Sequence, residues 1–135
     1  MNDRIAASFE RQSMMQTFGA TLDAVTQGHV TLSAPILPGS RQQQGFAHAA
    51  LTFGLGDSAA GYAALTTIPE DQEVVTAEIK INLTAPATGE RLIAKGRVIK
   101  PGRRLIVVSS EVFAVIDGVE TLVAVLQGTM VPVSA

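Results

Sequence analysis

The stretch QQQGFAHAALTFGLGDSAAGYAA, Gln42 to Ala64, decides the fold of this chain of 135 residues. After its polar beginning it consists almost entirely of small and apolar residues, which is typical of a buried helix that other elements approach closely. One acid, Asp57, interrupts this run, and no Lys or Arg occurs between Arg41 and Lys80. Because burying an unpaired carboxylate is costly, we expect Asp57 to have either a partner outside the segment or a functional role.

The composition limits the classes of function. Apolar residues make up 47% of the chain and charged residues 16%, so we expect some apolar surface to meet another subunit. The net charge is −2 and the basic residues are scattered, which argues against a nucleic-acid groove or a polybasic membrane patch. The length fits one domain, residues 1–135.

Cofactor, metal and targeting signals are not apparent in the sequence. With no cysteine, thiolate catalysis and sulfur-ligated metals are excluded, and His29 and His48 lack the carboxylate cluster of a metal site. GLGDSAAG does not complete a dinucleotide-binding motif, so we expect no cofactor. The N-terminal stretch does not resemble a secretory signal, and Leu51–Leu65 is too short and too weakly hydrophobic to span a bilayer. These features predict a cytoplasmic protein without a membrane partner.

Hydrophobic periodicity predicts an α+β fold in which a curved antiparallel sheet wraps around a long central helix. Ile5, Phe9 and Gln12-Ser13 recur at helical spacing and predict a short amphipathic helix, with Asp3 as its cap, that packs as a lid or brace. Two strands follow from Thr17 across a turn at Gln27–Gly28. The long helix is expected to begin at His48. Four more strands are predicted over residues 74–84, 90–100, 103–116 and 119–133. The sequences ATGE, PGRR and DG between them are interpreted as hairpin turns.

The strand over residues 74–84 alternates regularly and is predicted to be half-buried. One face carries Val75, Ala77, Ile79, Ile81 and Leu83, and the other carries Thr76, Glu78, Lys80, Asn82 and Thr84.

Asp57 and His48 are the strongest candidates for a site. The helical neighbours of Asp57 are Phe53, Gly54, Ala60 and Gly61, which leave the space of a cavity beside it, although a lone acid on a helix is more often simply exposed. His48 stands at the helix start, where a capping or core histidine is at least as common as a catalytic one. The amide groups of His48, Ala49 and Ala50 are predicted to be free to face an oxygen that gathers negative charge.

Three further candidates each have a simple structural explanation. The glutamine triplet at residues 42–44 fits a solvated loop, and Thr76 is a common strand residue. Arg103 and Arg104 fit an exposed hairpin better than a phosphate contact.

Taken together, these residues resemble the hotdog-fold acyl-CoA thioesterases of the phenylacetate-pathway (PaaI-like) type, over about Phe18 to Val131. The family pattern is an Asn or Gln, then G-x-x-H-G-G, then an acid nine residues after the His, and a Ser or Thr on the next strand ahead of P-A. The matching residues are Gln42, GFAH at 45–48, Asp57, Thr76 and Pro86-Ala87, and GRVIKPGR continues the likeness.

The resemblance implies hydrolysis of an acyl-CoA thioester. Asp57 would act as general base on water or attack the carbonyl itself, with Gln42 placing the water or nucleophile and Thr76 orienting the water. The helix that starts at His48 would supply the Ala49 amide to polarise the thioester oxygen. The family sequence HGG is HAA here, and the methyl groups of Ala49 and Ala50 narrow the approach without removing the amide donors.

The substrate-binding residues that the resemblance implies are Gly45, Ala50, Arg103 and Arg104, the two arginines as contacts for CoA phosphates. A protein that binds acyl-CoA or an acyl-carrier protein without hydrolysis is the main alternative, and a hotdog hydratase fits the spacing poorly.

The distance between His48 and Asp57 predicts a site built from two chains. Nine residues of continuous helix correspond to about 13.5 Å of rise and about 900° of rotation, so the two residues lie on opposite sides of the helix. Across a two-fold axis, the helix start of one chain can meet Asp57 of another. We therefore expect a homodimer, or a homotetramer formed as a dimer of dimers, with active sites at the subunit interface.

Overall fold

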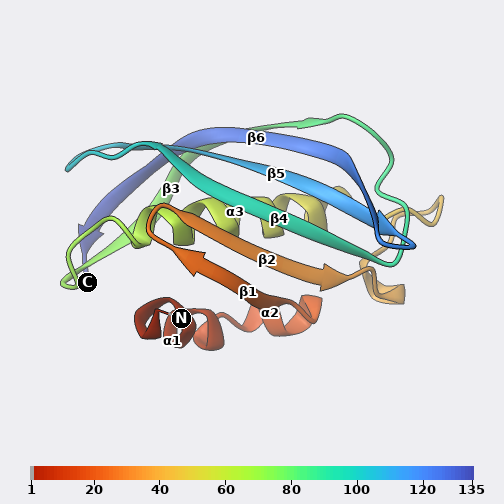
Figure 1. Cartoon of the computed structure of the whole chain (residues 1–135), viewed down its shortest axis with the longest axis horizontal. Coiled ribbons are helices and arrows are strands. Elements are labelled where there is room, and N and C mark those ends of the chain that lie inside the picture. Colours follow the sequence, from red (N-terminus) through yellow and green to blue (C-terminus); the bar gives the residue numbers. More distant parts are fainter. Residues whose placement is uncertain (1) are drawn as a thin grey trace.

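A six-stranded antiparallel sheet curves around one long helix in the computed structural model, which describes residues 2–135 (Figure 1). This is the predicted α+β architecture. The helices are α1 (Asp3–Arg11), α2 (Ser13–Phe18) and α3 (Ala49–Leu65), with a 3₁₀ turn, η1, at Pro38–Ser40. The strands are β1 (Thr21–Thr26), β2 (His29–Pro35), β3 (Gln72–Leu83), β4 (Arg91–Lys100), β5 (Ile106–Ile116) and β6 (Val119–Ser134).

The strands are ordered β1-β2-β4-β5-β6-β3 across the sheet, so β1 and β3 are its edges. Strand β3 pairs only with β6, and β4 lies between β2 and β5. The ATGE segment therefore does not form the expected hairpin, because it belongs to a connection that crosses from the edge of the sheet to its middle. The PGRR and DG segments do join neighbouring strands.

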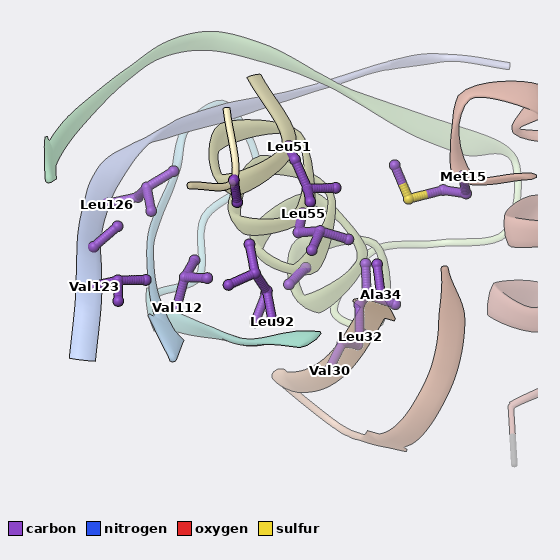
Figure 2. Close-up of a cluster of buried hydrophobic side chains, with 14 of the residues drawn as sticks. Met15, Val30, Leu32, Ala34, Leu51, Leu55, Leu92, Val112, Val123 and Leu126 are labelled. Atoms are coloured by element: carbon purple, nitrogen blue, oxygen red, sulfur yellow. The ribbon is translucent and has the colours of Figure 1, made fainter. Parts of the chain in front are cut away.

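Helix α3 packs directly on the sheet. Leu51 and Leu55 lie in one buried cluster with side chains such as Leu92 and Val112 from the strands (Figure 2). Further along the helix no side chain separates α3 from β4, since a Cβ atom at Gly96 would lie 2.3 Å from the carbonyl carbon of Ala59. Small residues on the helix and a glycine on the strand are therefore needed together at this crossing.

Helices α1 and α2 brace α3. The rings of Phe9 and Tyr62 lie 6.3 Å apart, and the ring of Phe18 lies against Gly54. Asn2 caps α1 in place of the expected Asp3, because its side-chain oxygen accepts the Arg4 and Ile5 amides. None of the helices within residues 2–135 has the length and apolar content needed to cross a bilayer.

The first strand begins at Thr21 rather than at Thr17. Residues 17 and 18 instead complete α2. The C-cap residue that follows the helix is Gly19, which has the left-handed conformation with φ at 69°. Because glycine adopts this conformation without strain, it ends the helix and turns the chain into β1. The fifth strand also begins later than expected, at Ile106, which leaves Arg103 and Arg104 in the turn before it.

A β-bulge at Ala77 changes the side-chain alternation of β3. Thr76 pairs with Met130 and Glu78 with Thr129, so Ala77 is an extra residue in the ladder. The predicted single alternation is therefore wrong before residue 77. Thr76 shares the inner face with Ile79, while Val75 is 49% exposed. The bulge re-aims Thr76 towards α3, as bulges beside functional sites often do.

The contact between α3 and β4 predicts a large effect of one methyl group. Gly96→Ala would press a Cβ atom into the backbone of Ala59 and should lower the free energy of unfolding by about 3 kcal/mol. Gly39→Ala is the control: a Cβ atom there meets nothing within 4 Å, so its effect should stay within about 0.5 kcal/mol. Urea titration measures both, and equal stabilities of the two variants would contradict this description of the packing.

Candidate active site

His48 is the N-cap of α3. Its side-chain Nδ1 accepts a hydrogen bond of 2.9 Å from the Ala50 amide, so Nδ1 is unprotonated and the ring proton lies on Nε2. The capping explanation of this histidine is therefore confirmed. The geometry gives the imidazole a local structural role at the beginning of the helix.

One of the three amides expected to be free is available at this helix start. The His48 amide donates to the Ser40 carbonyl at 2.9 Å, and the Ala50 amide is used by the cap. The expectation of three free donors is thus wrong for His48 and Ala50, because the preceding loop and the cap satisfy them. Among the described residues, nothing accepts from the Ala49 amide, which lies on the exposed end of the helix. The helix dipole makes this amide a favourable partner for a negatively charged oxygen.

Gln42 organises the turn that leads into α3. Its side-chain oxygen accepts from the Gln44 amide at 2.5 Å and from the Phe46 amide at 3.2 Å. Gly45 supplies the positive φ of 91° that the turn requires, and its carbonyl accepts from Arg41 at 2.7 Å. Gln42 is therefore held by its own loop, which fixes where its side chain lies.

Gln42 and Ala49 share one groove, which we call the amide groove, of about 500 Å³. Its walls come from the turn before α3, from the first turn of the helix and from the chain after β3. Further lining residues include Phe46, Thr52, Leu83 and Pro86.

Asp57 lines a second cavity, which we call the acid cleft, of about 230 Å³. Thr76 donates a hydrogen bond of 2.8 Å to Asp57 Oδ1, and this contact exists because the bulge in β3 turns Thr76 inwards. The partner of Asp57 outside its own segment is therefore a neutral hydroxyl. No Lys, Arg or His is among the described residues that line the cleft, so the carboxylate stays free of an ion pair there.

Ala49 and Asp57 are held apart within one chain. Helix α3 is continuous from Ala49 to Leu65, so the predicted separation of about 13.5 Å between residues 48 and 57 applies. The structure brings Gln42 together with Ala49, and Asp57 together with Thr76, in two different cavities. It does not bring the two pairs together.

The remaining predicted binding residues lie at the surface. Ala50 is exposed beside the cap, and Gly45 is exposed in the turn. Arg103 and Arg104 are exposed in the β4–β5 turn, and Arg103 lines a surface hollow with Pro69 and Gln72. They have no ion-pair partner within residues 2–135.

The acid cleft also contains residues that the sequence did not point to. Ser8 and Gln12 reach it from α1 and from the break before α2, and Ser58 and Tyr62 reach it from α3. Periodicity alone places Gln12 on an amphipathic helix. The helix is broken at Gln12, between α1 and α2, and this break directs the Gln12 side chain into the cleft. The sequence pattern alone gives no sign of the break.

Comparisons with known proteins identify the family and the fold of this chain. Residues 44–121 match the model of the Thioesterase superfamily. A thioesterase family protein from Silicibacter pomeroyi is 38% identical, with a TM-score of 0.95 over 98% of this chain and 97% of that one. The BH2602 protein from Bacillus halodurans, solved with CoA, is 25% identical, with a TM-score of 0.79 over 97% of this chain and 84% of that one.

Two other relatives are more distant or match in part. The E. coli PaaI protein of the phenylacetic acid degradation operon has the same fold, with a TM-score of 0.85 over 98% of this chain and 92% of that one at 18% identity. The esterase-named protein SSO1253 of Saccharolobus solfataricus is 36% identical over 87 residues, which cover 64% of this chain and 55% of that protein. The chain thus spans about half the length of this curated relative.

The chain belongs to the Thioesterase superfamily, a family of thioester hydrolases. The resemblance to the hotdog-fold thioesterases is thereby confirmed, and the E. coli PaaI protein shares the fold.

The cap at His48 leads to a stability prediction. His48→Ala removes the acceptor for the Ala50 amide and should lower the free energy of unfolding by about 1 kcal/mol. His48→Asn offers another short acceptor and should recover most of that loss. Chemical denaturation measures both, and equal losses in the two variants would show that the histidine side chain stabilises the chain in some other way.

Proposed function

We propose that this protein hydrolyses acyl-CoA thioesters to the free acid and CoA. The observation that carries the proposal is the open cleft in which Asp57 faces a space large enough for a reacting group, with the Thr76 hydroxyl as its one hydrogen-bond donor among residues 2–135. Membership of the Thioesterase superfamily supports the type of reaction, and the relative solved with CoA supports the type of substrate.

The chemistry follows from the groups in the two cavities. In one route Asp57 removes a proton from water as the water oxygen attacks the thioester carbonyl carbon, and in the other the carboxylate attacks this carbon itself. In both routes the carbonyl oxygen becomes negative, and the free Ala49 amide stabilises it. The carbon–sulfur bond then breaks and CoA leaves as a thiolate, which takes up a proton. In the first route the free acid has then formed, whereas in the second route the acyl group remains on Asp57 as an anhydride, which a water molecule hydrolyses to the free acid. Thr76 holds the carboxylate in position, and Gln42 shapes the turn that presents the amide.

We further propose that each active site combines the amide groove of one chain with the acid cleft of another. Strand β3 supports this arrangement because it is a sheet edge of 12 residues with exposed apolar side chains, Val75 at 49% and Leu83 at 55%. A free edge of this kind invites pairing with a second strand.

The register of that pairing would join the two cavities. If β3 pairs antiparallel with its own copy about an axis between Ile79 and Lys80, Leu83 of one chain lies opposite Thr76 of the other. Leu83 lines the amide groove and Thr76 lines the acid cleft. The minimal active unit is then a homodimer, and a dimer of dimers would contain two such units.

Arg103 and Arg104 are proposed to contact the phosphates of CoA. Both side chains are exposed, and Arg103 shares a hollow with Gln72 at the start of β3. Remote contacts of this kind contribute equally to binding of the substrate and of the transition state, so they affect KM more than kcat.

The proposed role of Asp57 predicts a large loss of rate on removal of its charge. Asp57→Asn should preserve the fold and lower thiol release from acyl-CoA by roughly 10²–10⁴. Asp23→Asn is a matched control, since Asp23 also accepts a hydrogen bond of 2.8 Å from a threonine hydroxyl but lies on β1, outside both cavities. Turnover by Asp57→Asn within threefold of the unchanged protein would show that this residue has no part in the mechanism. If the unchanged protein binds acyl-CoA without turnover, a non-hydrolytic binding role is favoured.

A shared site predicts recovery of activity by subunit exchange. Gln42→Ala and Asp57→Ala should each impair every site, whereas hybrids contain one doubly impaired site and one intact site. Random pairing makes about half of the dimers hybrid, so thiol release should rise to roughly a quarter of the unchanged rate. Mass-tagged subunits confirm the exchange, and confirmed hybrids without a gain in rate would show that each site lies within one chain.

A further inference from the structure

The acid cleft continues beyond Asp57 to the break between α1 and α2. Its far wall carries four polar side chains, from Ser8, Gln12, Ser58 and Tyr62. The catalytic proposal gives no role to these groups. Because a thioester held at Asp57 has CoA on one side and the acyl group on the other, the far wall is available to the acyl group.

The four side chains form one hydrogen-bonded network, in which Tyr62 and Gln12 connect Ser8 to Ser58. Gln12 Nε2 donates to the Tyr62 hydroxyl at 3.0 Å, and Ser58 Oγ donates to Gln12 Oε1 at 3.3 Å. The Ser8 and Tyr62 hydroxyl groups lie 3.2 Å apart. Tyr62 is only 7% exposed, and its ring packs against Phe9, so the network is anchored to the core.

The network keeps unused hydrogen-bonding capacity that faces the cleft. An amide side chain offers two donors and two acceptor positions, and only one of each is used by Gln12. A hydroxyl group on the acyl chain is both a donor and an acceptor, so it can bond to the unused donor and the unused acceptor position of Gln12. An alkyl group at the same place would leave these polar groups without water or a partner, which is unfavourable.

The charges around the cleft oppose a second carboxylate. Asp57 and Glu73 both line it, and no basic side chain does so among the described residues. Arg4, which forms an ion pair of 3.9 Å with Glu73, does not line the cleft and donates to the Ile68 and Gln72 carbonyl groups. The environment thus favours a neutral acyl group.

The size of the cleft favours a short acyl group. Its volume of about 230 Å³ is below the range of about 300–1,000 Å³ that is usual for drug-sized ligands. Gly61, one helical turn after Asp57, keeps the passage open, since a Cβ atom there would reach 3.8 Å from Met130 Cε without a clash.

We propose that the network of Ser8, Gln12, Ser58 and Tyr62 makes this protein selective for short, neutral acyl groups that carry a hydroxyl substituent. The inference rests on the proposed thioesterase function and on placement of the acyl group in the acid cleft. Gln12 and Tyr62 are its central specificity residues, because each contacts two of the other three members.

The test compares butyryl-CoA with 3- and 4-hydroxybutyryl-CoA and with succinyl-CoA, by thiol release. The unchanged protein should have a kcat/KM at least about tenfold higher for one of the hydroxylated substrates than for butyryl-CoA, and the lowest value for succinyl-CoA. Gln12→Met and Tyr62→Phe keep the shape of the side chains and should bring the ratio of the hydroxylated substrate to butyryl-CoA close to one. Gln16→Met is the matched control on α2, since Gln16 is exposed and donates only to the Glu10 carbonyl, and it should leave the ratio unchanged.

A second variant keeps the test valid if changes in the network disturb the fold. Gly61→Ala adds a methyl group without a clash and should lower kcat/KM for hexanoyl-CoA more than for butyryl-CoA. A ratio near one in the unchanged protein, or a preference that survives both Gln12→Met and Tyr62→Phe, would overturn the inference. If no thioester is hydrolysed, the proposed function is contradicted, and the selectivity is tested by binding alone. Calorimetry then compares the binding constants of the hydroxylated CoA esters and of butyryl-CoA, and a ratio near one would contradict the inference.

Discussion

The structure depends on the close contact between α3 and β4, where Gly96 leaves no side chain between strand and helix backbone. This contact requires small residues on the helix, which is why Ala59, Ala60 and Ala63 are completely buried. Larger apolar side chains lie on either side of this contact: Leu51 and Leu55 towards the beginning of the helix, and Tyr62 and Leu65 towards its end. Asp57 lies on a flank of the helix that turns towards β3, so the same constraint that builds the core leaves space for the acid cleft.

Each of the two cavities contains only some of the groups that the proposed hydrolysis needs. The amide groove has a free helix amide and no acid among its described lining residues, whereas the acid cleft has a carboxylate with no basic group. A straight helix of fixed pitch keeps these parts separate in one chain. In the proposed dimer, the edge strand β3 pairs antiparallel with its own copy. This pairing places the end of β3 at the amide groove of one chain beside the end of β3 at the acid cleft of the other.

The sequence predicted what depends on composition and periodicity: the central helix, its beginning at His48 and the strand content. It did not predict features that depend on partners distant in the chain. The bulge at Ala77 appears only when β3 is paired with β6, and the loss of free amides at His48 and Ala50 depends on Ser40 and on a side-chain rotamer. The order of the strands, and therefore the crossing after β3, is likewise set by pairing rather than by local turn signals. Gln12 was predicted on a helix, and its place in the cleft depends on a break in that helix.

The most direct test of the shared site is a crystal structure with an acyl-CoA analogue in which a methylene group replaces the thioester sulfur. We expect the carbonyl oxygen to lie about 2.7–3.1 Å from the Ala49 nitrogen of one chain. We expect the carbonyl carbon to face the Asp57 carboxylate of the other chain, within about 3.5 Å or across one water. A bound carbonyl group that contacts Ala49 and Asp57 of the same chain, or neither residue, would contradict a site shared between two chains.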